Sequence, residues 1–241
     1  MMVWRVIGYE MKRSLHYYVV WAAIAVILAF LARMQIFSLT DMPLFYLMLF
    51  GSVGIMIGRY NSTMHGAEAA FLFTTDMSPK EHMFARYCAA LILSIITALM
   101  TGAVLRIQGE ELSKILRNVS FPMGLMLTAE VTFSAFALFA EISAAWTLSN
   151  IRPFSQCPTA CFVVFGAMLI CGNSILPAMT KHLIPAYLVI AESGSVFVST
   201  VSDMPASVSF SLNTLVWNVI CTVIIITCIP AIIRKKLLIV K

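Results

Sequence analysis

Residues 17–32 read YYVVWAAIAVILAFLA, an apolar run that contains no charged side chain. A run of this kind predicts a helix that crosses a membrane. Tyr17, Tyr18 and Trp21 stand at its start, where aromatic rings typically anchor a transmembrane helix at the interface between lipid and water. The rest of the chain repeats this pattern.

The overall composition indicates that lipid is the solvent of this protein. Hydrophobic residues make up 61% of the 241 positions, charged residues make up 11%, and the mean hydropathy is +0.93. A soluble domain averages about 45–50% apolar and about 25% charged residues. The formal charge of +5 would suggest nucleic-acid binding in a soluble protein. Here Lys and Arg gather at the ends of apolar runs, which indicates membrane topology and anionic lipid headgroups instead.

Five further apolar runs are long enough to be spans. They cover residues 43–58, 83–105, 121–148, 159–176 and 212–233. The connections between them are short, so we expect one domain over residues 1–241. The predicted fold is all-α, a polytopic membrane protein with six transmembrane helices.

Residues 177–208 do not fit a simple span. The stretch 184–202 is apolar, but Pro185, Glu192, Gly194 and several serines interrupt it. Such a segment is more plausible as an external re-entrant segment, provided that its backbone is buried in protein. A seventh span there would also place the basic C-terminus on the wrong side of the membrane.

The distribution of Lys and Arg supports six spans with both termini in the cytoplasm. This arrangement places 11 of the 16 basic residues inside and five outside, as the positive-inside rule requires. Residues 1–16 then form an amphipathic helix in the cytoplasmic interface, with Val3 and Ile7 on its apolar stripe and Lys12 and Arg13 off it. We expect this helix to be retained, because the following apolar run is longer than that of a signal peptide.

The sequence carries no recognisable catalytic or metal-binding motif. It has no GxxxxGK[ST] loop for a nucleotide, no HExxH and no GxSxG. Cys157 and Cys161 form a CxxxC pair, but no second pair or histidine cluster accompanies it, so zinc is not expected. An intramembrane enzyme would need a close catalytic set that the sequence does not display.

Glu130 and Glu141 both fall within the run 121–148, and Ser134 adds polarity between them. Eleven residues make about three helical turns, so the two carboxylates share a face about 16 Å apart, too far to share a proton. Carboxylates in a span usually face the bundle interior or a water-filled cavity. They line a translocation path or a subunit interface, or else they form structural salt bridges or lie near enough to an interface to be hydrated.

Residues 66–76, GAEAAFLFTTD, form the predicted cytoplasmic connection between the second and third spans. They can make a short helix with an apolar patch at Phe71 and Phe73, suited to a soluble partner; alternatively this helix lies on the headgroups. Ser78 and Glu81 follow, and their spacing predicts a capping box at the start of the third span.

Two of these stretches resemble the ABC-2 type permeases, the membrane subunits of ABC exporters. The stretch 9–13, YEMKR, is similar to their opening helix, and 65–80, HGAEAAFLFTTDMSPK, resembles their coupling-helix region. The chain departs from the family pattern with Met77 where proline is usual and Arg86 near a frequent lysine. The proline-interrupted stretch 175–209 resembles the external re-entrant helices of the family.

The resemblance implies a transport subunit that is not itself an enzyme and holds no cofactor. ATP and Mg²⁺ would be bound by a separate ABC ATPase subunit, docked on the coupling helix 66–76, and a second permease copy would complete a homo- or heterodimer. Glu10 would support this contact by pairing with a nearby base. The residues implied in coupling are Glu10, Gly66, Glu68, Phe71, Phe73 and Asp76.

The implied location is a bacterial plasma (inner) membrane, and the implied activity is export of an amphipathic or apolar cargo. An antimicrobial or other peptide is favoured, while a lipid or drug-like molecule remains open. The alternative is a stand-alone ion- or proton-coupled secondary transporter that uses Glu130 and Glu141. Against it, the two halves of the chain show no evident repeat.

Overall fold

The computed structural model describes residues 2–34, 41–64, 78–108, 121–151, 154–184, 186–191, 196–199 and 207–239. Its long helices are α1 (Met2–Arg33), α2 (Asp41–Met64), α4 (Pro79–Gln108), α6 (Phe121–Ser149), α7 (Pro158–Thr180) and α8 (Leu212–Ile239). A short 3-10 helix, η1 (Phe154–Gln156), precedes α7. Six of the described helices are long and apolar enough to cross a membrane, as predicted.

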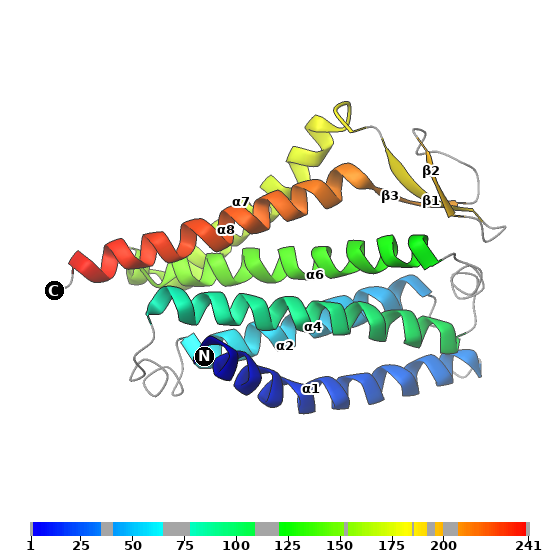
Figure 1. Ribbon diagram of the computed structural model, residues 1–241, viewed down its shortest axis with the longest axis horizontal. Coiled ribbons are helices and arrows are strands. Elements are labelled where there is room, and N and C mark those ends of the chain that lie inside the picture. Colours follow the sequence, from blue (N-terminus) through cyan, green and yellow to red (C-terminus); the bar gives the residue numbers. More distant parts are fainter. Residues whose placement is uncertain are drawn as a thin grey trace.

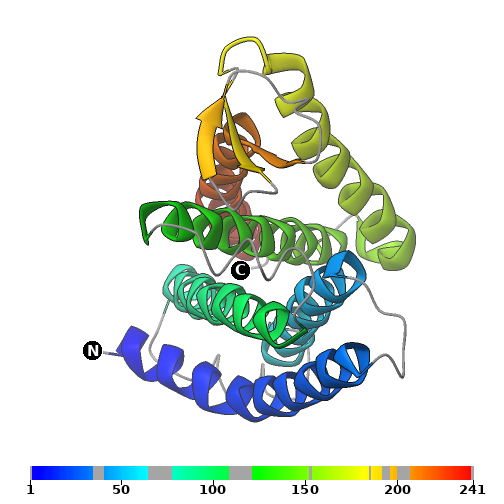
Figure 2. The same ribbon diagram turned by 90° about the vertical axis from the view of Figure 1, so that its right-hand side faces the viewer.

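The helices run back and forth along one common direction (Figure 1). Both chain termini lie at one end of the bundle, which is also where α2 ends and α4 begins. Viewed from the end, α2 and α4 lie between α1 and α6, while α7 and α8 cover the far side of α6 (Figure 2). An even number of helices therefore returns the chain to the end where it started.

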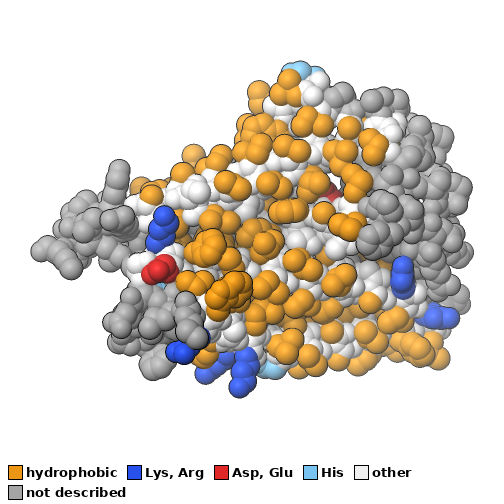
Figure 3. Space-filling model, viewed as in Figure 1, with side chains coloured by type: hydrophobic (Ala, Val, Ile, Leu, Met, Phe, Trp, Pro, Cys, Tyr) orange, Lys and Arg blue, Asp and Glu red, His pale blue; other side chains and the backbone are white. Residues whose placement is uncertain are grey.

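The surface follows the pattern expected of a protein in lipid (Figure 3). Apolar side chains cover the middle of the face shown, and the Lys and Arg side chains lie toward its two ends. Large apolar residues in the middle of the helices are exposed, among them Val20 and Ile27 on α1 and Val163 and Met168 on α7. In water this surface would be strongly unfavourable, whereas in a bilayer it meets hydrocarbon.

The core forms where small side chains let helices approach closely. Ala135, Ala140 and Ala144 on α6 are fully buried. Against them lie aromatic rings from α2 and α4: the rings of Tyr60 and Tyr87 each stand nearly perpendicular to that of Phe139, with centroids 5.9 Å apart. Small residues allow membrane helices to approach closely, and edge-to-face contacts between aromatic rings are favourable. Both are found where α6 packs against α2 and α4.

The first helix differs from the prediction of a separate interfacial helix over residues 1–16. These residues are helical from Met2, but they continue without a break into the span as α1, which curves along its length (Figure 1). Val6 and Ile7 are buried against Ala85 and Ala89 of α4. The apolar stripe therefore packs on protein, and this contact keeps the start of the helix on the bundle.

The segment 177–208 also differs from the prediction of external re-entrant helices. The helix α7 continues to Thr180, and the described residues beyond it form strands: β1 (Tyr187–Ala191), β2 (Val196–Ser199) and, in the same sheet, β3 (Ser207–Ser211). The antiparallel sheet has the order β2-β1-β3, with Leu188 opposite both Val198 and Phe210. The sequence of β3 alternates serine with Val208 and Phe210, which is the period-two pattern typical of a strand.

The capping box at the start of α4 is confirmed. The backbone N–H of Ser78 donates to Oε2 of Glu81 at 2.9 Å, and the backbone N–H of Glu81 donates to Oγ of Ser78 at 3.3 Å. These two bonds satisfy backbone donors that the first turn of a helix otherwise leaves open. The helix α4 therefore begins at the predicted capping box, four residues before the apolar run 83–105.

Candidate functional site

The predicted coupling residues Gly66, Glu68, Phe71, Phe73 and Asp76 lie outside the described residues. The two helices that flank them are described, however. The helix α2 ends at Met64 and α4 begins at Pro79. The structure therefore shows how the two ends of this connection are held, and the sixth predicted coupling residue, Glu10, takes part in holding them.

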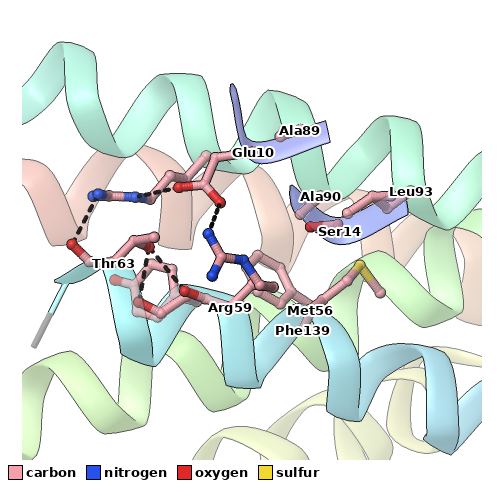
Figure 4. Close-up of a pocket in the computed structure, with 11 residues that line it drawn as sticks. Glu10, Ser14, Met56, Arg59, Thr63, Ala89, Ala90, Leu93 and Phe139 are labelled. Carbon is pink, nitrogen blue, oxygen red and sulfur yellow. Dashed lines mark hydrogen bonds and ion pairs between the residues drawn. The ribbon is translucent and has the colours of Figure 1, made fainter. Parts of the chain in front are cut away.

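Glu10 is the centre of a buried ion-pair cluster, here called the Glu10 cluster, formed with Arg59 and Arg86. Glu10 lies on α1 and is only 5% exposed. Nη2 of Arg59, on α2, donates to its Oε2 at 3.4 Å, and Figure 4 shows these two side chains pointing toward one another. Nε of Arg86, on α4, lies 3.6 Å from its Oε1. The prediction that Glu10 pairs with a nearby base is thus confirmed, with two bases instead of one.

The same cluster also binds the end of α2 through its backbone. Nη2 of Arg86 donates to the carbonyl oxygen of Thr63 at 3.0 Å. Thr63 lies in the last turn of α2, where carbonyl groups have no partner within the helix and carry the negative end of the helix dipole. A buried guanidinium is favourable at this position, so Arg86 joins α4 both to Glu10 and to the end of α2.

A small cavity of about 20 Å³ lies beside these charges. Ser14, Met56, Leu93 and Phe139 line it together with the members of the Glu10 cluster (Figure 4). This volume has room for about one water molecule. The cavity is therefore too small to hold a cargo or a nucleotide. The charged side chains of the Glu10 cluster instead join α1, α2 and α4 to one another.

A hydrogen bond extends the link from α2 into the core. The hydroxyl groups of Tyr60 and Thr147, on α2 and α6, lie 2.7 Å apart. Tyr60 follows Arg59 directly in the sequence. The Glu10 cluster and this bond together connect α1, α2, α4 and α6 near the end of the bundle where the predicted coupling segment begins and ends.

Glu141 lies in a second polar region, between α6, α7 and α8, and Glu130 lies on the same helix, α6. Glu130 and Glu141 are 9% and 3% exposed, so both carboxylates are buried on α6 as predicted. No ion pair is recorded for either of them in the part of the chain that the structure describes. The structural alternative of two salt bridges therefore has no support among these residues.

Three polar side chains form a chain of hydrogen bonds across these helices, here called the amide chain. Nδ2 of Asn173, on α7, donates to Oδ1 of Asn218, on α8, at 2.9 Å. Nδ2 of Asn218 donates to Oγ of Ser134, on α6, at 3.4 Å. Asn173 also lies close enough to the carboxylate of Glu141 to interact with it. The structure thus brings Ser134 and Glu141 into one polar region. Among the described residues, Glu130 has no hydrogen bond to any member of the amide chain.

A neighbouring group of polar contacts holds the C-terminal end of α7 against α8. Nδ2 of Asn213 donates to the carbonyl oxygen of Pro177 at 2.7 Å, and Nε1 of Trp217 donates to Oγ1 of Thr180 at 2.6 Å. Such contacts are valuable between membrane helices, where the hydrophobic effect does not drive association. The described face of α7 buries only Pro177, so α7 depends on these polar links.

Sequence reasoning missed four residues of these regions: Arg59, Arg86, Asn173 and Asn218. Three of them fall inside predicted spans, and a polar or charged side chain within a span is itself a sign of a buried partner. Arg59 lies one residue beyond the predicted end of its span. Its role depends on the approach of α1 to α2, which a local pattern does not reveal.

The described residues include no group of three or more His, Cys, Asp or Glu side chains that could hold a metal ion. The polar regions that the structure does show are the Glu10 cluster at one end of the bundle and the amide chain in its interior. Comparison of the chain with protein-family models finds no match, and comparisons with curated proteins and with solved structures find none either.

Proposed function

We propose that this chain is the permease subunit of an ATP-driven exporter of the ABC-2 type, working with a separate ATPase subunit. The observation that carries the proposal is the position of the Glu10 cluster. Glu10 binds Arg59 near the end of α2 and Arg86 near the start of α4. These helices are the two stems of the segment 66–76, on which the ATPase would dock.

This geometry supports a mechanical role for the cluster. A docked ATPase would push or pull on both stems when it binds ATP. Because Glu10 joins both stems to α1, and Tyr60 joins α2 to α6 through Thr147, the displacement would pass to the bundle instead of bending one helix. Buried ion pairs resist separation, since breaking one leaves a charge uncompensated in a medium of low dielectric constant.

The proposed orientation places this end of the bundle in the cytoplasm. Arg59, Lys80 and Arg86 belong to the described residues at this end, and α8 brings Arg234, Lys235 and Lys236 to it. A cytoplasmic excess of basic residues is the rule for short membrane connections. The membrane would be the plasma (inner) membrane of a bacterium, with both termini inside.

A second permease copy, identical or related, and membrane lipid would cover the apolar outer faces. The helix α7 suits such a role because Val163, Val164 and Met168 are exposed on it. The cargo would be amphipathic or apolar, with a peptide favoured, and it would leave between the two copies. Ser134, Glu130 and Glu141 would then lie on the path or next to it, since they supply polarity inside the bundle.

The test is affinity purification of the tagged full-length chain from gently solubilised membranes of its native host, followed by mass spectrometry. We expect a soluble ATPase in a stoichiometric amount. A matched purification of the variant Phe71→Ala should lose the ATPase while the permease yield stays the same. A permease that is stable and monodisperse without any ATPase would contradict the proposal.

Glu130 and Glu141 form no ion pair with any of the described residues, and this favours a second candidate, an ion- or proton-coupled secondary transporter. Buried carboxylates that face a bundle interior are used in proton and cation pathways. This candidate predicts transport that persists without ATP and is lost in Glu130→Gln or Glu141→Gln. Transport that requires an ATPase would exclude it.

A further inference from the structure

The first half of α1 has one basic face. Arg5, Lys12, Arg13 and His16 are exposed, and Tyr9 lies half-buried among them. Their spacing places all five on one side of a helix, and they are here called the basic stripe. Figure 3 shows Lys and Arg side chains along the lower edge of the molecule, where the first half of α1 lies in Figure 1.

The other side of the same helix segment is packed on protein. Val6 and Ile7 are buried against α4. Glu10 is buried too, where it pairs with Arg59 and Arg86. Glu10 is also the only acidic residue of α1. The basic stripe therefore contains no carboxylate, and its side chains point away from the bundle.

Four members of the stripe line a hollow in the surface. Tyr9, Lys12, Arg13 and His16 border a volume of about 300 Å³, whereas one water molecule needs only about 10–15 Å³. The guanidinium carbon of Arg13 lies over the ring of Tyr9, 5.4 Å from its centroid. The ring centroids of His16 and Tyr17 are 3.8 Å apart. The hollow is thus bordered by polar side chains that rest on aromatic rings.

The same side of α1 becomes apolar one turn further along. Val20 lies four residues after His16, and Ile27 lies seven residues after Val20, so both continue the line of the stripe. Each is 58% exposed. At 1.5 Å per residue, Val20 lies about 6 Å along the helix from His16 and about 12 Å from Lys12. The headgroup layer of a bilayer leaflet is about 5–8 Å thick, so this change of polarity matches its depth.

A phosphate group fits the chemistry of the hollow. Its oxygens are anionic acceptors, while Lys and Arg side chains are cationic donors and a guanidinium can bind two phosphate oxygens at once. A free phosphate would meet only the polar part of this surface. A phospholipid would meet both parts, because its acyl chains can lie on Val20 and Ile27 while its phosphate lies near Lys12 and Arg13.

We propose that the basic stripe is a binding site for an anionic phospholipid, with the headgroup in the hollow and the acyl chains along Val20 and Ile27. A lipid with a net negative charge is preferred to a zwitterionic one, because the stripe has the permanent charges of Arg5, Lys12 and Arg13 and no carboxylate. The site requires only that the chain lies in a membrane, so it does not rest on the proposed exporter function.

Lipid binding would also stabilise the start of α1. The stripe and the residues that hold α1 to the bundle, Val6, Ile7 and Glu10, belong to the same helix segment. A ligand that binds the folded protein and not the unfolded chain raises its stability. The bound lipid would therefore support the contacts of the Glu10 cluster from the opposite side of the helix.

Native mass spectrometry of the purified full-length protein in detergent tests the site. The affinities for dioleoyl phosphatidylglycerol, which is anionic, and for dioleoyl phosphatidylcholine, which is zwitterionic, are measured in turn. We expect the wild type to bind phosphatidylglycerol more tightly. Each Lys or Arg near an anionic surface strengthens the attraction about fivefold, so Lys12→Gln/Arg13→Gln should bind phosphatidylglycerol about thirtyfold more weakly. Its affinity for phosphatidylcholine should stay the same.

The matched control is Arg33→Gln/Lys181→Gln. This double variant removes the same charge from exposed positions, one at the C-terminal end of α1 and one just after α7. It should bind phosphatidylglycerol as the wild type does. An equal loss in both double variants would show that the overall charge attracts the lipid, and this would overturn the proposal. Equal binding of the two lipids by the wild type would overturn it as well.

Inorganic phosphate distinguishes a lipid site from a site for a free phosphate. Sodium phosphate, added at constant ionic strength, should leave phosphatidylglycerol bound to the wild type. Displacement of the lipid would mean that the hollow binds a free phosphate group and that the lipid proposal is wrong.

Thermal unfolding provides a second readout. Phosphatidylglycerol should raise the melting temperatures of the wild type and of Arg33→Gln/Lys181→Gln, and it should have little effect on Lys12→Gln/Arg13→Gln. Without added lipid all three proteins should unfold at about the same temperature, because the substituted side chains are exposed. An equal rise in all three proteins would contradict a site at the basic stripe.

Discussion

The indole ring of Trp21, on α1, covers Gly51 of α2 so closely that a β-carbon at Gly51 would overlap the ring. This contact fixes how near the first two helices come to one another. Gly54 and Gly58, on the same helix, have no atom within 4 Å of the corresponding position. The three glycines of α2 are therefore not equivalent, although each lies three or four residues from the next.

Replacement of Gly51 by alanine should destabilise the bundle by about 1–3 kcal/mol, because the added methyl group forces the indole out of place. Thermal unfolding of the purified protein measures this as a lower melting temperature. Gly54→Ala and Gly58→Ala are the controls and should stay close to the wild type. Equal melting temperatures for Gly51→Ala and Gly54→Ala would show that the contact between Trp21 and Gly51 does not limit the packing.

Replacement of Glu10 by glutamine should lower stability by about 3–5 kcal/mol, because it removes the carboxylate that lies between two buried guanidinium groups. The yield of folded protein and the melting temperature report the loss. Lys12→Gln, at an exposed position on the same helix, should have little effect. A Glu10→Gln protein as stable as the wild type would mean that the arginines do not depend on this carboxylate.

Substitutions in the segment 66–76 should affect partner binding and not the fold. Glu68→Ala and Phe71→Ala are expected to reduce the amount of co-purified ATPase at least about tenfold, the equivalent of about 1.4 kcal/mol of binding energy. The melting temperature of the permease alone should not change. Variants that keep full ATPase binding and activity would show that the contact lies elsewhere.

Replacement of Ser78 by alanine removes the N-cap of α4 and should cost about 1 kcal/mol. Hydrogen exchange should become faster at the first backbone amides of α4, including that of Glu81. Ser62→Ala is the control, because the hydroxyl of Ser62 bonds only to the backbone of its own helix at Gly58. Equal exchange in both variants would argue against a structural role for the capping box.

The helices could be predicted from the sequence because long apolar runs have few alternatives in a membrane. The strands could not be predicted on the same basis. The resemblance predicts re-entrant helices over 175–209, whereas the alternation of serine with Val208 and Phe210 over 207–211 is the period-two pattern of a strand. The composition of a segment shows whether it is apolar, and only the spacing of its apolar and polar residues distinguishes a helix from a strand.

The candidate site was predictable in part. Glu130 and Glu141 stand out because a carboxylate in an apolar run is costly, whereas Glu10 is implied by the resemblance to the ABC-2 type permeases. The structure buries all three. Their neighbours depend on which helices meet. The pairing of Glu10 with Arg86 requires α1 to pack against α4, and the approach of Asn173 to Glu141 requires α7 to pack against α6. No local pattern contains that information.

The sheet passes directly into the last helix: β3 ends at Ser211, and α8 begins at Leu212. The backbone N–H of Leu212 also donates to the carbonyl oxygen of Ala186, just before β1, at 3.0 Å. With no flexible joint between them, strand and helix form one lever. A tilt of α8 at the end where the chain terminates would therefore swing the sheet at the opposite membrane surface, and a fluorophore at the exposed Val198 would follow that motion.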